Sequence, residues 1–172
     1  MKKKSIMQTA ILAIAIMLVS VTTWAQSPAA TATGKVNGAN LTIKYSSPSV
    51  KGRKVWGDLV PFDKVWRAGA NEATILETDK DITIEGKAVP KGKYSVYMIP
   101  GEKEWTVIIN SQTGQWGITR QGETTRDSAK DVAVVKVKSV KSAATAEALK
   151  YNVTASGFSL VWENLEVPVS VK

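Results

Sequence analysis

The sequence contains neither cysteine nor histidine, although it is 172 residues long. Without cysteine the fold has no disulfide, so its stability has to come from a hydrophobic core, which a chain of this size can bury. The two absences also exclude thiol nucleophiles, Ser-His-Asp triads and zinc sites built from histidine or cysteine. The chemistry that remains is that of carboxylate, lysine, tyrosine and arginine side chains, or of a cation held by oxygen ligands.

Long apolar runs are scarce, and the one that exists lies at the N-terminus. Residues 2–4 are all lysine, residues 6–21 are almost wholly apolar, and Thr23-Trp24-Ala25 has the small-x-small pattern of a cleavage site. This order is typical of a secretory signal peptide, and the run is shorter than the roughly 18 to 20 residues of a spanning helix. We therefore predict a signal peptide at 1–25 that is cleaved after Ala25. The mature chain would be secreted or periplasmic, with no transmembrane segment.

The positive charge of the chain is modest once that peptide is removed. The formal net charge is +8, and residues 1–25 carry three lysines and no acidic residue, so the predicted mature chain carries +5. Its lysines are scattered along the chain, whereas proteins that bind nucleic acid concentrate basic residues on one face or helix. The charge pattern therefore argues against nucleic acid as a partner.

Helical periodicity is also missing, and short alternating runs separated by turn residues take its place. Asn37-Gly38 between two such runs is a hairpin signal. We predict an all-β fold, a single antiparallel β-sandwich or flattened barrel of about nine strands. Residues 26–33 are expected to form a flexible tail and 34–172 one domain. The expected strands include 41–46, 73–77, 81–85, 93–99, 105–110, 131–140, 149–153, 158–162 and 167–171.

Three stretches depart from simple alternation. Residues 111–131 are polar and rich in Gly and Thr, which indicates a long loop or a ragged pair of edge strands. The alanines of 143–148 allow one helical turn. Pro168 in the last run favours an edge position, because proline cannot donate to a ladder.

The segment Ser47–Glu72 is the candidate site, because it breaks the alternation and gathers charged and aromatic side chains. In one interpretation it is a long crossover whose apolar residues plug the core, with Trp56 and Trp66 as packing anchors. In the other, polar side chains converge on a pocket beside a tryptophan wall. The candidate binding residues are Arg53, Trp56, Trp66, Arg67, Asn71 and Glu72, together with Trp116, which lies between glycines in a polar loop. In one interpretation Trp116 is an exposed platform for a ligand, and in the other it is a packing residue.

Arg67 leads to a sharper expectation within that segment. Its forked donors suit a carboxylate, phosphate or sulfate group, and beside an indole face they also suit a sugar. We predict that its side chain is at least half buried and paired with Glu72 or with another carboxylate. Trp105 and Trp162 lie in alternating strands and are predicted to belong to the core.

Catalysis from this set would be carboxylate chemistry, with Glu72, Asp58 and Asp63 as the nearby acids. Asp58 and Asp63 lie beside Gly57 and Pro61, where aspartate is a common turn residue. Asp79-Lys80-Asp81 lacks the spaced ligands and the glycine of a calcium loop, so it is interpreted as a solvated hairpin tip. We predict no metal and no cofactor.

Most of the mature chain resembles one bacterial family. The resemblance is carried by YSSPSVKGRKVWGDLVPFDKVWRAGANEAT (45–74), VPKGKYSVYMIPGEKEWTVIIN (89–110), QWG (115–117) and the closing runs 160–163 and 167–169. The family is domain of unknown function 2911, whose members look like secreted or periplasmic proteins. The resemblance implies a location and no activity.

Two functions therefore stand as hypotheses. The first, which the residues favour, is a non-catalytic module of the cell envelope that binds a glycan, a peptide or a secreted protein. The second is a small carboxylate-dependent hydrolase or isomerase with a pocket lined by Trp, Arg and Glu. A cleft with two facing carboxylates would favour the enzyme, and a Trp-lined groove without them the binding module.

Overall fold

The computed structural model describes residues 26–172, so the predicted signal peptide lies outside the described residues. The regular structure of the described chain is almost entirely strand, with no α-helix, which confirms the predicted all-β class. A single 3-10 turn, η1 (Ser128–Lys130), precedes β8. The strands are β1 (Ala29–Val36), β2 (Ala39–Ser46), β3 (Thr74–Thr78), β4 (Ile82–Ile84), β5 (Lys87–Val89), β6 (Gly92–Ile99), β7 (Glu104–Asn110), β8 (Asp131–Lys138), β9 (Val140–Thr154) and β10 (Gly157–Ser170).

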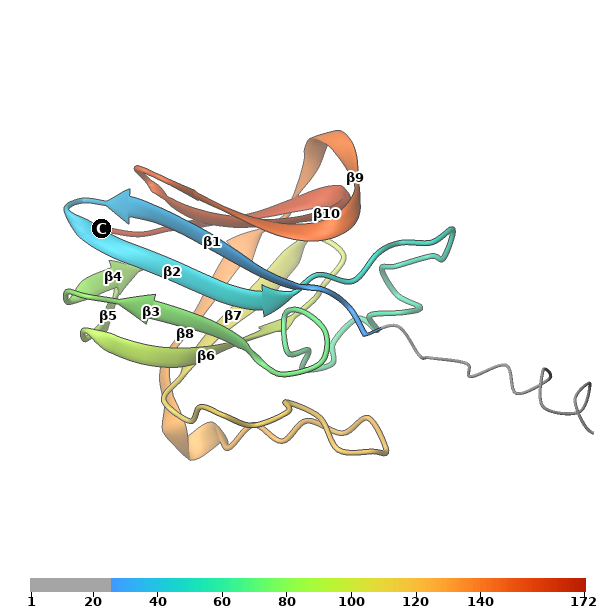
Figure 1. Ribbon diagram of the computed structural model, residues 1–172, viewed down its shortest axis with the longest axis horizontal. Helices are drawn as coiled ribbons and strands as arrows, with labels where there is room; N and C mark the ends of the chain where they lie inside the picture. Colours follow the sequence, from blue (N-terminus) through green and yellow to red (C-terminus); the bar gives the residue numbers. More distant parts are fainter. Residues whose placement is uncertain (1–25) are drawn as a thin grey trace, which may run out of the picture.

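The strands form an antiparallel sandwich rather than a closed barrel. The main sheet has six strands in the order β1-β2-β3-β6-β7-β8, and β9 and β10 form a separate two-stranded ribbon that lies over one face of it (Figure 1). Strands β4 and β5 make a second small hairpin. No helix among residues 26–172 is long and apolar enough to cross a bilayer.

The N-terminal end differs from the prediction in one respect. The expected flexible tail 26–33 is mostly strand, because β1 begins at Ala29 and pairs with β2 along its whole length. Asn37 and Gly38 both have positive φ, which is the backbone that a tight two-residue hairpin requires, so the predicted hairpin is confirmed. At Gly34 a Cβ atom would lie 2.6 Å from Cγ1 of Val153, so β1 can approach the ribbon this closely only with glycine there.

The β9–β10 ribbon is longer and more curved than the sequence indicated. The expected helical turn at 143–148 is wrong, because β9 runs through it and Ala146 pairs with Glu163. The runs 158–162 and 167–171 are likewise one strand, bent where the register shifts around Glu163, whose φ is +54°. The bend brings Val171 back to the start of β10, since Val171 N donates to Ser156 O (3.0 Å). Pro168 lies beyond the last residue that pairs with β9, as a residue without an N–H requires.

The core lies between the main sheet and the ribbon. Trp105 and Trp162 are 0% and 1% exposed, which confirms both as core residues. Tyr94 belongs to this core, whereas Tyr97, on the opposite face of β6, packs with Ala73 and Ile108 in a small second cluster. The outer face of the main sheet is therefore also partly covered.

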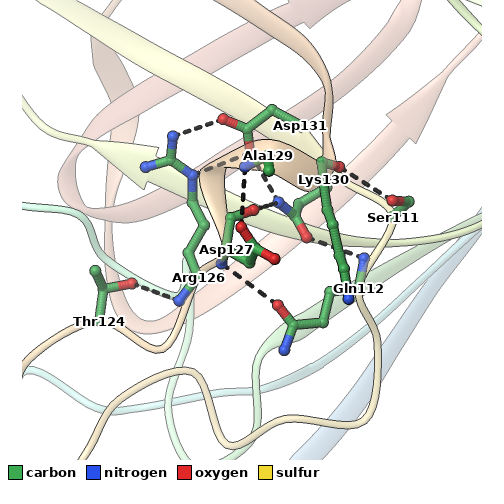
Figure 2. Close-up of polar contacts among 9 residues, drawn as sticks. Ser111, Gln112, Thr124, Arg126, Asp127, Ala129, Lys130 and Asp131 are labelled. Atoms are coloured by element: carbon green, nitrogen blue, oxygen red, sulfur yellow. Dashed lines mark hydrogen bonds and ion pairs between the residues drawn. The ribbon is translucent and has the colours of Figure 1, made fainter.

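The cover over that outer face is residues 111–127, the β7–β8 loop, drawn in yellow to orange on the side of the sheet away from the ribbon (Figure 1). Its base is a dense polar network (Figure 2). Arg126 forms two hydrogen bonds with Asp131, Nε to Oδ1 at 3.0 Å and Nη2 to Oδ2 at 2.6 Å. Buried Asn110 donates to Asp131 Oδ1 and to Asp127 O, each at 2.8 Å. These bonds fix both ends of the loop on the sheet.

Candidate functional site

A groove of about 710 Å³ lies between two irregular segments. One wall is the β2–β3 segment (47–73), which contains the Ser47–Glu72 stretch singled out in the sequence, and the other is the tip of the β7–β8 loop, residues 118–124. The volume is within the range of about 300 to 1,000 Å³ that is usual for small-molecule sites. This groove is thus built by the two longest non-strand connections within residues 26–172.

Four tryptophans stand beneath the groove. Trp66 stacks on Trp162, with ring centroids 6.1 Å apart and an angle of 19° between the planes, and both line the groove. Trp56 packs edge-on against Trp105 (4.9 Å) and Trp162 (5.6 Å) and is itself buried in the core. The apolar half of the β2–β3 segment therefore does plug the core, and the same plug provides an aromatic floor for the groove.

Arg67 lines the groove with a guanidinium that has no counter-ion among residues 26–172. The side chain is half buried, as predicted, and Nη1 is buried without a hydrogen-bond partner among residues 26–172. Burial lowers the pKa of Arg67, because desolvation penalises its charged form. The predicted ion pair with Glu72 is wrong: Glu72 is exposed, and Arg67 is in none of the ion pairs of the described chain.

The backbone after Arg67 is held in an unusual conformation. Ala68 is fully buried and has a φ of +54°, a region that residues other than glycine seldom adopt. Its carbonyl oxygen accepts hydrogen bonds from Thr74 Oγ1 (2.9 Å) and from Tyr151 OH (2.8 Å). Burial raises the pKa of Tyr151, which keeps its hydroxyl protonated as a donor. The turn that presents Arg67 is therefore rigid.

The β7–β8 loop closes tightly on the Arg67 side chain. Gly117 has a φ of +94°, and a Cβ atom there would lie 2.9 Å from Arg67 Cβ and 3.1 Å from Cδ. The neighbouring Trp116 is 47% exposed, and its ring centroid is 6.0 Å from Arg67 Cζ, within reach of a cation–π contact. Arg67 thus stands where the two walls meet.

The matching family model covers residues 27–171 and is described as a protein of unknown function, DUF2911. The chain belongs to the DUF2911 family. No curated protein and no solved structure matches it. The groove of this DUF2911 domain therefore has to be interpreted from its own residues.

The groove carries charges of both signs. Arg53, Lys64 and Arg67 line it together with Asp63 and Glu123. Arg53 already donates to two backbone carbonyls, those of Ser49 and Val50, so its guanidinium is largely satisfied. Both carboxylates are exposed, and no three carboxylates of residues 26–172 are grouped so that they could hold a metal ion.

Two of the candidate residues from the sequence lie away from the groove. Asn71 donates from Nδ2 to Ser27 O (2.9 Å) and to Ser46 Oγ (3.1 Å), which ties the start of the chain to β2. Glu72 lines a separate hollow, over β1 and β2, with Lys44 and Lys93. The structure therefore brings Arg53, Trp66 and Arg67 into the groove, with Trp116 beside Arg67 and Trp56 in the core below.

Sequence reasoning missed the second wall of the DUF2911 groove. Glu123 and Thr124 reach it from a polar loop far along the chain, and Trp162 reaches it from β10. Nothing local in those stretches pointed to the segment 47–72. The one available signal was Gly117, since a glycine next to an exposed tryptophan indicates a close approach of the backbone to something.

Proposed function

We propose that residues 1–25 of this DUF2911 chain are a signal peptide that directs its export. We further propose that its β-domain is a non-catalytic binding module of the cell envelope. The ligand would be a glycan, a peptide or a secreted protein that enters the groove. The observation that carries the proposal is the groove itself, with a stacked pair of tryptophans at its floor and, in its wall, a half-buried arginine that has no counter-ion in the described part of the chain. An aromatic surface with a few fixed donors is typical of a ligand site.

One observation favours the alternative, a carboxylate-dependent hydrolase or isomerase. Asp63 and Glu123 line the same groove. Both are exposed, however, whereas a carboxylic acid that donates a proton near neutral pH is normally kept in an apolar pocket. Asp63 also has a φ of +58°, which suits a turn residue that is retained for the backbone. Binding is therefore the better-supported function.

The experiment compares a variant that fills the groove with one that does not. Gln121 is exposed and lines the groove, so Gln121→Trp should obstruct it, while Asn152→Trp adds the same side chain on exposed β9, outside the groove. The mature protein would be applied to arrays of defined neutral and acidic oligosaccharides and of defined peptides. We expect signals that Gln121→Trp abolishes and Asn152→Trp keeps. No signal, or signals that survive Gln121→Trp, would contradict a groove-binding module.

The same ligands decide between binding and catalysis. A bound oligosaccharide or peptide is expected to keep its mass after long incubation with the protein. Cleavage that stops in Glu123→Gln or in Asp63→Asn would instead assign the groove to a hydrolase.

A further inference from the structure

Resting on the proposed function, we infer that the ligand of the groove is an acidic oligosaccharide whose carboxylate binds to Arg67. The inference names the chemical class of the ligand and the side chain that recognises its charge. It rests on what Arg67 lacks, on how firmly it is held, and on what surrounds it.

Arg67 differs from other arginines of the same domain in its hydrogen-bond partners. Arg126 is paired with Asp131 through two hydrogen bonds, and Arg53 donates to two backbone carbonyls. Arg67 is half buried, yet its buried Nη1 has no partner among the described residues. A guanidinium removed from water normally gains an acceptor, because desolvation without one is costly. Because Arg67 lines the groove and is in none of the ion pairs of residues 26–172, a ligand there could supply the acceptor that Asp131 supplies to Arg126.

The partner that Arg67 lacks has to be a hydrogen-bond acceptor, and a negatively charged one suits it best. The guanidinium is a donor-only group, so it can be satisfied only by an acceptor, and a carboxylate matches its fork best. The buried Nε1 atoms of Trp56, Trp105 and Trp162 also lack acceptors within residues 26–172, so Arg67 is the one unpartnered charged group among these buried donors. A ligand that satisfies it has to supply oxygen acceptors.

The position of the Arg67 side chain is fixed in advance by the contacts around it. Thr74 and Tyr151 clamp the carbonyl of Ala68, and Gly117 closes against the aliphatic part of Arg67. The positive φ at Ala68 is a strained conformation that the surrounding contacts maintain. A structural arginine needs no such presentation, whereas a recognition arginine binds more tightly when its geometry is fixed beforehand.

The walls of the groove favour a sugar over an acidic peptide as the ligand. Extended peptides usually bind by adding a strand to a free sheet edge, which provides a ladder of backbone donors and acceptors. The walls of this groove are the β2–β3 segment and the β7–β8 loop, so they provide no such edge. The floor provides the indole surface of Trp66 instead, and half-exposed Trp116, which does not line the groove, lies beside Arg67. An apolar ring face near an unpaired guanidinium suits a uronic acid.

The test uses three probes with the mature protein: trigalacturonic acid, its neutral methyl ester, and triglutamate. Calorimetry gives the affinities, and tryptophan fluorescence gives a second readout, because Trp66 and Trp162 line the groove. Arg67→Met keeps the aliphatic stem against Gly117 and removes the donors. Arg120→Met, on the exposed tip of the β7–β8 loop and outside the groove, makes the same change of charge.

We expect the wild-type protein to prefer trigalacturonic acid to its methyl ester and to triglutamate by at least about tenfold, a difference of about 1.4 kcal/mol. Arg67→Met should remove that preference, Arg67→Lys should keep part of it because the charge stays and the fork is lost, and Arg120→Met should change it less than about twofold. Thermal unfolding of each variant verifies that it is folded.

Each other outcome overturns the inference in a recognisable way. Equal affinity for acid and ester in the groove would remove the role of the carboxylate and leave the proposed binding function standing. Triglutamate that binds as tightly as trigalacturonic acid, with the same dependence on Arg67, would replace the sugar by a peptide. Failure of all three probes would refute the acidic oligosaccharide, while the array experiment with Gln121→Trp separately decides whether the groove binds anything.

Discussion

Arg126 lies in the β7–β8 loop and Arg67 contacts the same loop at Gly117, and the contrast between the two arginines separates scaffold from site. Arg126 is fully matched: Asp131 accepts two of its hydrogen bonds, and Asn110 holds Asp131 in place (Figure 2). Arg67 is half buried like Arg126, but its buried Nη1 is unmatched among residues 26–172. The first arrangement stabilises the fold, and the second leaves a charge ready for a ligand.

The pKa directions express the same contrast. The hydrogen bond to Asp131 raises the pKa of Arg126 despite some burial, whereas burial alone lowers the pKa of Arg67. A charged group whose partner is within the protein is favoured by folding, and one whose partner is absent is disfavoured. The two arginines should therefore respond in opposite ways to substitution.

The largest loss of stability is expected at Trp105, because it supports both the groove and the strand that carries the Asn110–Asp131–Arg126 network. Trp105 lies in β7, which ends at Asn110, and it packs against Trp56 and Trp66 below the groove. Trp105→Ala leaves a large cavity and should destabilise the domain by about 3 to 5 kcal/mol. Chemical denaturation measures the loss. A cost below about 1 kcal/mol would mean that the tryptophan cluster is not a rigid part of the core.

The next effect tests the matched arginine. In Asp131→Ala the partly buried Arg126, whose side chain is 16% exposed, would lose its only ion-pair partner in the described chain. We expect a loss of about 2 to 4 kcal/mol, because stranding a buried charge costs more than the pair contributes. Glu104→Ala is the control, since its partner Lys136 is 70% exposed and such surface pairs contribute about 1 kcal/mol at most. Equal losses in the two variants would refute the distinction.

Acid should weaken the matched region in particular. Burial raises the pKa of Asp131, but hydrogen bonds from Arg126 and Asn110 outweigh it, and the net pKa lies below the usual value. A carboxylate with a lowered folded-state pKa contributes stability above its unfolded pKa of about 3.9, and this stability is lost as the pH falls through the folded-state pKa. Melting temperatures from about pH 6 to 2 should therefore fall less steeply in Asp131→Asn than in the wild type. Parallel curves would show that Asp131 does not contribute.

A smaller difference in stability is expected between variants of Asn71 and Glu72, the two candidate residues that lie away from the groove. Asn71→Ala should cost about 1 kcal/mol, because it leaves Ser27 O and Ser46 Oγ without their donor. Glu72 is exposed, so Glu72→Ala should change the stability by less than about 0.5 kcal/mol. Thermal denaturation of both variants under one condition is sufficient. A larger loss in Glu72→Ala than in Asn71→Ala would reverse the assignment.

The smallest effect on stability is expected at Arg67 itself. Arg67→Met keeps the stem that contacts Gly117 and removes a charge that has no partner in the described chain. The unfolding free energy should change by less than about 0.5 kcal/mol or rise slightly, because a site residue is retained for function rather than for stability. Chemical denaturation of Arg67→Met and Asp131→Ala under the same conditions gives the comparison. A loss above about 2 kcal/mol would make Arg67 a structural residue.

The sequence predicted the strands of the main sheet well, because one face of each is buried and alternation follows from that. The two-residue turn at Asn37-Gly38 was equally clear, since few other dipeptides favour its backbone. The ribbon was predicted poorly. The alanines of 143–148 are good helix formers, but their pairing with β10 overrides that preference.

The candidate site was predicted in part, and the error has a physical cause. Arg67 and Glu72 are five positions apart, which suggested a pair. Ala68 and Asn71 between them both have positive φ, so the chain turns and Glu72 lies over a different face. The opposite wall of the groove comes from residues 118–124 through tertiary contacts alone, and no spacing rule within one segment could have found it.

The pairing of residue 172 with the strand β4 joins residues that are far apart in the sequence. Lys172 N donates to Thr83 O at 2.9 Å, and Thr83 N donates to Lys172 O at 2.6 Å, across 89 positions of sequence. Pairings between such distant residues form slowly, because the ends of a long segment have to meet before the contact is made. This ladder should therefore be among the last contacts to form when the domain folds.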